Sequence, residues 1–173
     1  MISRIKRIFK HRWLDASAAQ RAIPPAMLQR LQQQVAASEQ HHSGEIRIYV
    51  EAGLPMSYLW RKASTGQISR QRALAMFSKL RVWDTERNNG VLIYLLLIER
   101  VIEVVADRGL NDKVAPQVWQ KMVSSMQQAF KQGDFEPGLT QALDQVSTLL
   151  VQHFPLAAGE TNPNELPDRP LLG

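Results

Sequence analysis

Residues 88–109 read NNGVLIYLLLIERVIEVVADRG, and this stretch constrains the architecture more than any other part of the chain. The eight apolar or aromatic residues at 91–98 are too few to cross a bilayer, which takes about 20, but they suit a strand buried on both faces. Glu99-Arg100 predicts a two-residue reversal, and residues 101–106 then return as a second strand. The two strands form a hairpin, so both ends of the stretch lie at one edge of a sheet.

Length and composition indicate one folded domain. The chain has 173 residues, of which 45% are hydrophobic and 21% charged, which is enough for a real core. There is no cysteine, so disulfides, thiolate metal sites and a cysteine nucleophile are excluded. No apolar segment resembles a secretory signal or a membrane span. We therefore expect a cytoplasmic protein.

The net charge of +5 comes from one short segment. Residues 1–14 contain no acidic residue and five basic ones: Arg4, Lys6, Arg7, Lys10 and Arg12. The rest of the chain carries 16 basic and 16 acidic residues, so it has no overall attraction for phosphate backbones, and no nucleic-acid partner is expected.

The same segment predicts a short basic helix with an apolar stripe made of Ile2, Ile5, Phe9 and Trp13. Two interpretations remain open. The helix either lies on an anionic membrane surface, as a peripheral adaptor would, or packs its stripe on the domain.

Periodicity divides the remaining chain into helices and strands. Alternation of apolar and polar residues predicts a half-buried strand at residues 45–51. Apolar residues at helical spacing predict four helices, at residues 25–40, 69–80, 114–131 and 137–153. Because a helix joins the first strand to the strand at 91–98, these two strands should be parallel, with a right-handed crossover.

These elements predict an α/β fold: a three-layer α/β/α sandwich with a small mixed sheet, built from a parallel pair plus a hairpin. We expect a basic N-terminal helix and linker at residues 1–25 and the α/β domain at residues 26–154. Residues 155–173 are rich in proline and lack periodicity, which predicts an extended or disordered tail that is dispensable for folding.

Oxygen-bearing side chains gather at the edge where the two parallel strands begin. The predicted set is Glu45, Asp84, Asn88, Asn89, Asp107 and Asp112. Carboxylate and amide oxygens without histidine or cysteine suit a hard cation, Ca²⁺ or Mg²⁺. The alternative is that these residues only form turns, since Asp and Asn bond their own backbone.

Signals for catalysis are weak. The chain has no phosphate-cradling glycine loop, so no nucleotide cofactor is expected, and no nucleophile with a recognisable base partner. His41 and His42 are expected to be an exposed loop pair. The catalytic residues, if any, are unknown at this stage.

Several motifs resemble the TPM-domain family, named for a thylakoid-lumen acid phosphatase, a photosystem II repair protein and a nematode receptor auxiliary subunit. The resemblance covers residues 26–154 and is carried by SGEIR at 43–47, WDT at 83–85, NNGVLI at 88–93, VVADRG at 104–109 and FKQGDF at 130–135. It is greatest to the soluble bacterial branch. It implies an α/β/α sandwich, divalent-cation binding near the Asn-Asn-Gly loop, weak acid phosphatase activity in a plant member and service to membrane proteins.

Together these observations lead to one principal hypothesis and two alternatives. We expect a cytoplasmic accessory domain that binds a divalent cation and a protein partner. The alternatives are a weak metal-dependent acid phosphatase and a peripheral membrane-surface adaptor.

Overall fold

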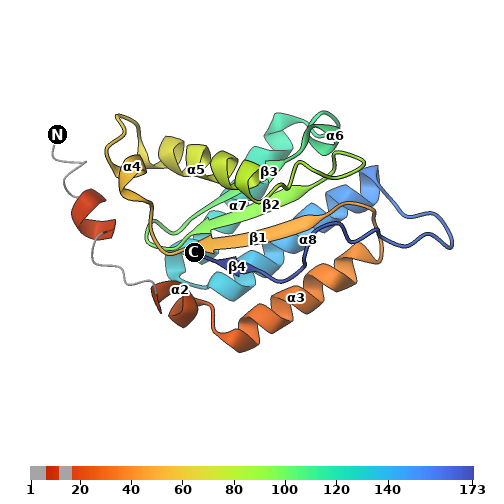
Figure 1. Cartoon of the computed structure of the whole chain (residues 1–173), viewed down its shortest axis with the longest axis horizontal. Coiled ribbons are helices and arrows are strands. Elements are labelled where there is room, and N and C mark those ends of the chain that lie inside the picture. Colours follow the sequence, from red (N-terminus) through yellow and green to blue (C-terminus); the bar gives the residue numbers. More distant parts are fainter. Residues whose placement is uncertain (1–6, 12–16) are drawn as a thin grey trace.

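The centre of the molecule is a four-stranded sheet with the strand order β3-β2-β1-β4, seen in a computed structural model that describes residues 7–11 and 17–173 (Figure 1). The strands are β1 Ile46–Glu51, β2 Val91–Leu96, β3 Val101–Ala106 and β4 Leu171–Leu172. Strand β1 is parallel to β2 and to β4, whereas β3 runs antiparallel to β2. The predicted parallel pair and hairpin are both present.

Helices cover both faces of this sheet, which confirms the three-layer α/β/α sandwich. One face carries α2 Ser17–Ala22, α3 Pro25–Glu39, α7 Pro116–Gln132 and α8 Phe135–His153. The other face carries α4 Met56–Leu59 and α5 Thr65–Lys79, and the short helix α6 Arg108–Asn111 follows β3.

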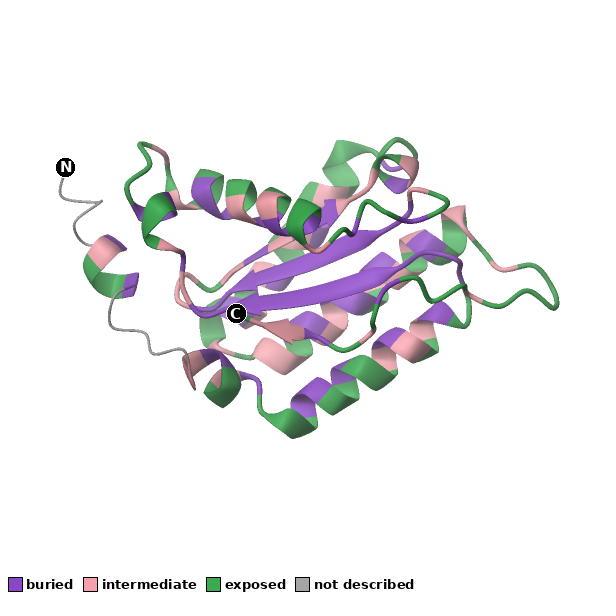
Figure 2. Ribbon diagram, viewed as in Figure 1, coloured by how far each residue is buried: buried purple, intermediate pink, exposed green. Residues whose placement is uncertain are grey.

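The long apolar run of β2 is explained by burial on both faces. Val91, Ile93 and Leu95 pack on the side of α3, α7 and α8. Leu92 and Tyr94 point to the α5 side. Figure 2 shows β1 and β2 buried along their whole length. A strand between two helical layers has no solvent face, so the sequence does not alternate.

Two element boundaries differ from the sequence prediction. Strand β2 ends at Leu96, and the reversal spans residues 97–100 instead of two residues, with Arg100 at φ 52°. Helix α5 begins one turn earlier than predicted because Ser64 and Gln67 form a capping box that closes its first turn.

The tail folds back onto the sheet. Leu171 and Leu172 pair with β1, and Leu166 is only 9% exposed within the core on the α5 side. The buried Arg47 guanidinium donates to the carbonyl oxygens of Pro167 and Arg169, the latter at 3.0 Å. The segment is therefore extended and packed on the sheet, so the structure no longer favours the expectation that it is dispensable for folding.

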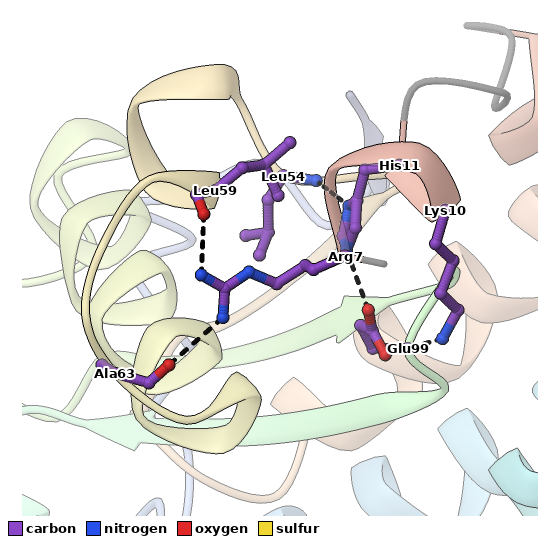
Figure 3. Close-up of polar contacts among 7 residues, drawn as sticks. All are labelled: Arg7, Lys10, His11, Leu54, Leu59, Ala63 and Glu99. Carbon is purple, nitrogen blue, oxygen red and sulfur yellow. Dashed lines mark hydrogen bonds and ion pairs between the residues drawn. The ribbon is translucent and has the colours of Figure 1, made fainter. Parts of the chain in front are cut away.

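Helical residues 7–11 lie against the end of the sheet near α4 (Figure 3). The Arg7 side chain is 7% exposed, and it donates to the carbonyl oxygens of Leu59 at 2.7 Å, Arg61 at 2.9 Å and Ala63 at 3.1 Å. The Arg7 guanidinium therefore supplies hydrogen-bond donors to three backbone carbonyl groups, at the end of α4 and in the loop after it.

His11 joins the same segment to two parts of the domain (Figure 3). Its Nδ1 accepts a hydrogen bond from the Leu54 backbone N–H at 2.9 Å, so Nε2 carries the proton and donates to Glu99 at 2.9 Å. Lys10 reaches the same carboxylate at 2.7 Å. The hydrogen bond from His11, together with Lys10, lowers the pKa of Glu99 to about 2.

The contacts of residues 7–11 are those of a segment that packs on the domain, the second of the two interpretations given above. Phe9, a member of the predicted stripe, is 61% exposed and does not form the packed side. The other predicted stripe residues and cations lie outside the described residues: Ile2, Ile5, Trp13, Arg4, Lys6 and Arg12.

Candidate functional site

Four of the six predicted site residues lie along one edge of the sheet, where β1 and β2 begin and β3 ends. The Val91 N–H donates to the Glu45 carbonyl at 2.8 Å, and the Asp107 N–H donates to the Gly90 carbonyl at 2.9 Å. Asn88 joins them because its carbonyl accepts from the Gly109 N–H at 2.9 Å. Asn89 lies between Asn88 and Gly90 and is fully buried.

The side chains at this edge mostly make local contacts. Asn89 donates from Nδ2 to the Ser43 carbonyl at 3.0 Å, and Asn88 accepts from the Arg108 guanidinium at 3.1 Å. Asp107 is the N-cap of α6, where it accepts from the Arg108 N–H at 2.7 Å. These contacts are ones that the turn-forming alternative predicts, but Asn89 Oδ1 and Asp107 Oδ2 are buried and have no hydrogen-bond partner among the described residues, so both interpretations of this edge stay open.

The other two predicted site residues, Asp84 and Asp112, make no backbone contact of this kind with the strands at the edge. Asp84 is exposed and forms an ion pair with Arg81. Asp112 is exposed and is the C-cap of α6. Within residues 7–11 and 17–173, no three carboxylate or imidazole side chains are already arranged to hold a metal ion. Cation binding by the six predicted residues stays a prediction.

The ordered tail adds a second acidic group next to Glu45. Asp168, on the tail, and Glu39, at the end of α3, line a cavity of about 370 Å³. Asn162 and Asn164 also line it. Oxygen donors from α3 and from the tail therefore meet beside the start of β1.

Burial and mutual repulsion perturb these carboxyl groups. Burial, together with the neighbouring Glu45 and Asp168, raises the pKa of Glu39 to about 8. Burial also raises the pKa of Glu45, although the backbone N–H groups of Glu165 and Leu166 offset part of the rise, and the charges of Glu165 and Asp168 add to it. Carboxylates that share a desolvated space cannot all ionise without a compensating charge, so at neutral pH Glu39 holds a proton.

One oxygen in this group has no partner. Glu45 is fully buried, and its Oε2 accepts from the Leu166 N–H at 3.0 Å. Its Oε1 is buried and makes no hydrogen bond to the described residues. A buried carboxylate oxygen without a donor costs free energy, which a bound cation or proton would recover.

The sequence did not reveal Glu39 and Asp168 as site residues. Glu39 lies on a predicted helix and Asp168 on a predicted extended or disordered tail, and no periodic pattern connects them. The available signal was compositional: Glu160, Glu165 and Asp168 lie among prolines and asparagines in a segment with no basic residue before Arg169.

His42 differs from the expected exposed loop residue. It is fully buried, with Nε2 2.8 Å from Ser38 Oγ and Nδ1 3.1 Å from the Gly44 carbonyl. Burial lowers the pKa of His42 to about 4, which makes its imidazole a weak general base at neutral pH. The Ser38–His42 contact therefore gives little support to nucleophilic catalysis.

No helix in the described part of the chain is both long and apolar enough to span a membrane.

Comparison with known proteins agrees with the fold and with the motifs. Among solved structures, the chain is similar to the BA42 protein of the psychrophilic bacterium Bizionia argentinensis, determined by NMR. The two share 26% sequence identity with a TM-score of 0.73, over 87% of this chain and 95% of that chain. No curated protein matches. The family model of the TPM domain matches residues 18–149, and the chain belongs to the TPM-domain family.

Proposed function

We propose that this TPM domain is a cytoplasmic accessory protein that binds a divalent cation, Ca²⁺ or Mg²⁺, beside the start of β1. The observation that carries the proposal is the unpartnered, buried Oε1 of Glu45 close to Glu39, whose pKa burial raises to about 8. The donor chemistry supports a hard cation, because the carboxyl groups of Glu39 and Asp168 line the cavity.

Glu39, Glu45 and Asp168 would hold the cation, which would supply the positive charge that the cavity lacks. The three carboxyl groups are not preorganised as a metal cage in the described residues, so binding has to draw them together. The cation would replace the proton on Glu39 and fasten the tail to the body. A weak site that couples binding to tail attachment suits an accessory role better than catalysis.

Calorimetry with CaCl₂ or MgCl₂ alone tests this proposal on the full chain. At pH 7 the cation should be taken up with release of close to one proton, read from titrations in two buffers of different ionisation enthalpy. Glu39→Gln should abolish the proton release, because glutamine has no ionisable proton. It should also weaken binding by about tenfold or more, because glutamine offers the cation no carboxylate charge.

Asp84→Asn and Asp112→Asn are matched controls, since both are exposed carboxylates from the originally predicted set, and both should bind as the unmodified chain does. Two results contradict the proposal. One is no heat at millimolar cation. The other is loss of binding in Asp84→Asn with Glu39→Gln unchanged, which would locate the cation in the Asn-Asn-Gly loop.

A further inference from the structure

The open edge of the sheet lies at the floor of a groove. Among the described residues, strand β3 pairs with β2 alone, and α5 and α7 pack against it from opposite faces (Figure 1). Between them is a cavity of about 470 Å³, lined by Arg70 of α5, by Val104 and Ala106 of β3, and by Trp119 and Val123 of α7. Its floor is therefore a strand edge and its walls are helices.

The register of the hairpin shows which backbone groups face this groove. The Asp107 N–H bonds Gly90, so Val105 and Glu103 also face β2 in the alternating antiparallel pattern. Val104 and Ala106 consequently turn their N–H and C=O groups outward. Arg70 confirms the direction, because its Nη1 donates to the Val104 carbonyl at 2.6 Å. A strand that pairs with Val104 would take the place of this guanidinium, which is then free to bind a carboxylate.

The side chains of the groove offer hydrogen-bond donors and a positive charge. Arg70 is 44% exposed, and its contact with Glu103 is loose at 3.6 Å, whereas Glu103 itself is 17% exposed. The indole Nε1 of Trp119 is buried and has no acceptor among the described residues. Glu103 lines the same cavity, but the guanidinium is the more exposed of the two charged groups, and it favours an acceptor-rich, acidic occupant.

We propose that this groove binds an extended acidic segment of a partner protein, which pairs with β3 as an additional strand and places a carboxylate beside Arg70. Outward N–H and C=O groups that alternate along an edge are matched by extended backbone, and flanking helices provide side-chain pockets. A second copy of the chain fits less well, because its own α5 and α7 would meet those of the first copy and its Arg70 would face like charge.

A random seven-residue peptide library displayed on phage, selected on the immobilised full chain, provides the probe. Selected peptides should be rich in β-branched residues and carry Asp or Glu. Synthesised with fluorescein, they should bind Arg70→Glu about tenfold or more weakly by anisotropy, since one charge pair becomes repulsive. Lys79→Glu is the matched control, an exposed residue of the same helix outside the groove, and should bind normally. Circular dichroism checks that both variants fold.

Amide hydrogen exchange distinguishes strand pairing from contact through side chains alone. A saturating selected peptide should slow exchange at Val104 and Ala106 by about tenfold or more, while Glu103 and Val105, already bonded to β2, stay unchanged. Three results overturn the proposal. They are no enrichment over blank matrix, equal binding to Arg70→Glu, and protection of Val104 and Ala106 without peptide in a sample that light scattering shows to be a dimer.

Discussion

At the residue scale, the chain places carboxyl groups where water cannot solvate them. Glu39 is 5% exposed and Glu45 is fully buried, and each raises the electrostatic cost of ionising the other. Glu39 accepts a hydrogen bond from the Ile46 N–H at 3.1 Å, which only partly offsets this cost. The acidic cavity is therefore a source of pH-dependent stability as well as a candidate site.

The variant Glu39→Gln should change how stability depends on pH. The pKa of Glu39 rises from its ordinary 4.5 to about 8 on folding, so the folded state binds the proton more tightly. Stability is then complete below pH 4.5 and is lost as the pH rises towards 8. Glu39→Gln should flatten this decline and be the more stable protein at pH 8.

Urea unfolding of both proteins at pH 5, 6.5 and 8, without divalent cations, measures the effect. Asp112→Asn serves as the control and should follow the unmodified chain at every pH. Parallel curves for Glu39→Gln and the unmodified chain would show that Glu39 ionises freely in the folded protein.

Residue-level prediction succeeded where strand direction determined proximity. Glu45, Asn89 and Asp107 were placed at one sheet edge because parallel strands begin together and a hairpin returns to its origin. The direction of a strand does not determine which groups a side chain contacts. Asn88, for example, accepts a hydrogen bond from Arg108, and nothing in the sequence indicates this contact. The burial of His42 likewise depends on tertiary neighbours.

At the element scale, the last segment behaves as part of the sheet. Leu166 fills the core on the α5 side, and its N–H is the donor to Glu45. The segment is rich in proline and short polar runs. It lies on the body as extended backbone, which needs no regular amphipathic face. That is why periodicity missed it, although the same method found the helices and the hairpin.

Shortening Leu166 to alanine should destabilise the domain by about 2–4 kcal/mol, because a buried leucine leaves a cavity when truncated. Removing residues 155–173 should cost more, since Arg47 loses its carbonyl acceptors. Leu74→Ala, the same substitution at a leucine 45% exposed on α5, should cost less than about 1 kcal/mol. Thermal and urea unfolding provide the measurement, and equal effects for the two leucines would contradict the packing.

At the scale of the whole molecule, the topology was predictable and the attachments were not. Because a helix connects the first two strands, they were expected to be parallel. Because both faces of the sheet are apolar, helices were expected to cover both, which gives the sandwich. The contacts of Arg7 depend on backbone carbonyls at the end of α4 and in the loop after it, and Leu59 lies 52 residues further along the chain. No local pattern encodes such a contact.

Arg7 and Lys10 separate the two interpretations of the N-terminal segment. If the segment holds the domain together, Arg7→Ala should cost about 1–3 kcal/mol, because three carbonyl groups lose a charged donor. Lys10→Ala, which removes a lysine that is 48% exposed from the pair with Glu99, should cost at most about 1 kcal/mol. Urea unfolding measures both. If the segment acts on an anionic membrane, the two variants should lose vesicle co-sedimentation equally, since each removes one cation.

The parallel pairing of β4 with β1 also has a consequence for biosynthesis. Tyr49 pairs with Leu171, so β1 leaves the ribosome about 120 residues before its outer neighbour. At about 5–20 residues per second, the nascent chain holds that edge unpaired for roughly 6–24 s. An unpaired apolar strand edge is a template for association with other chains. Chaperone demand during translation should therefore be greatest in the interval between emergence of β1 and arrival of the tail.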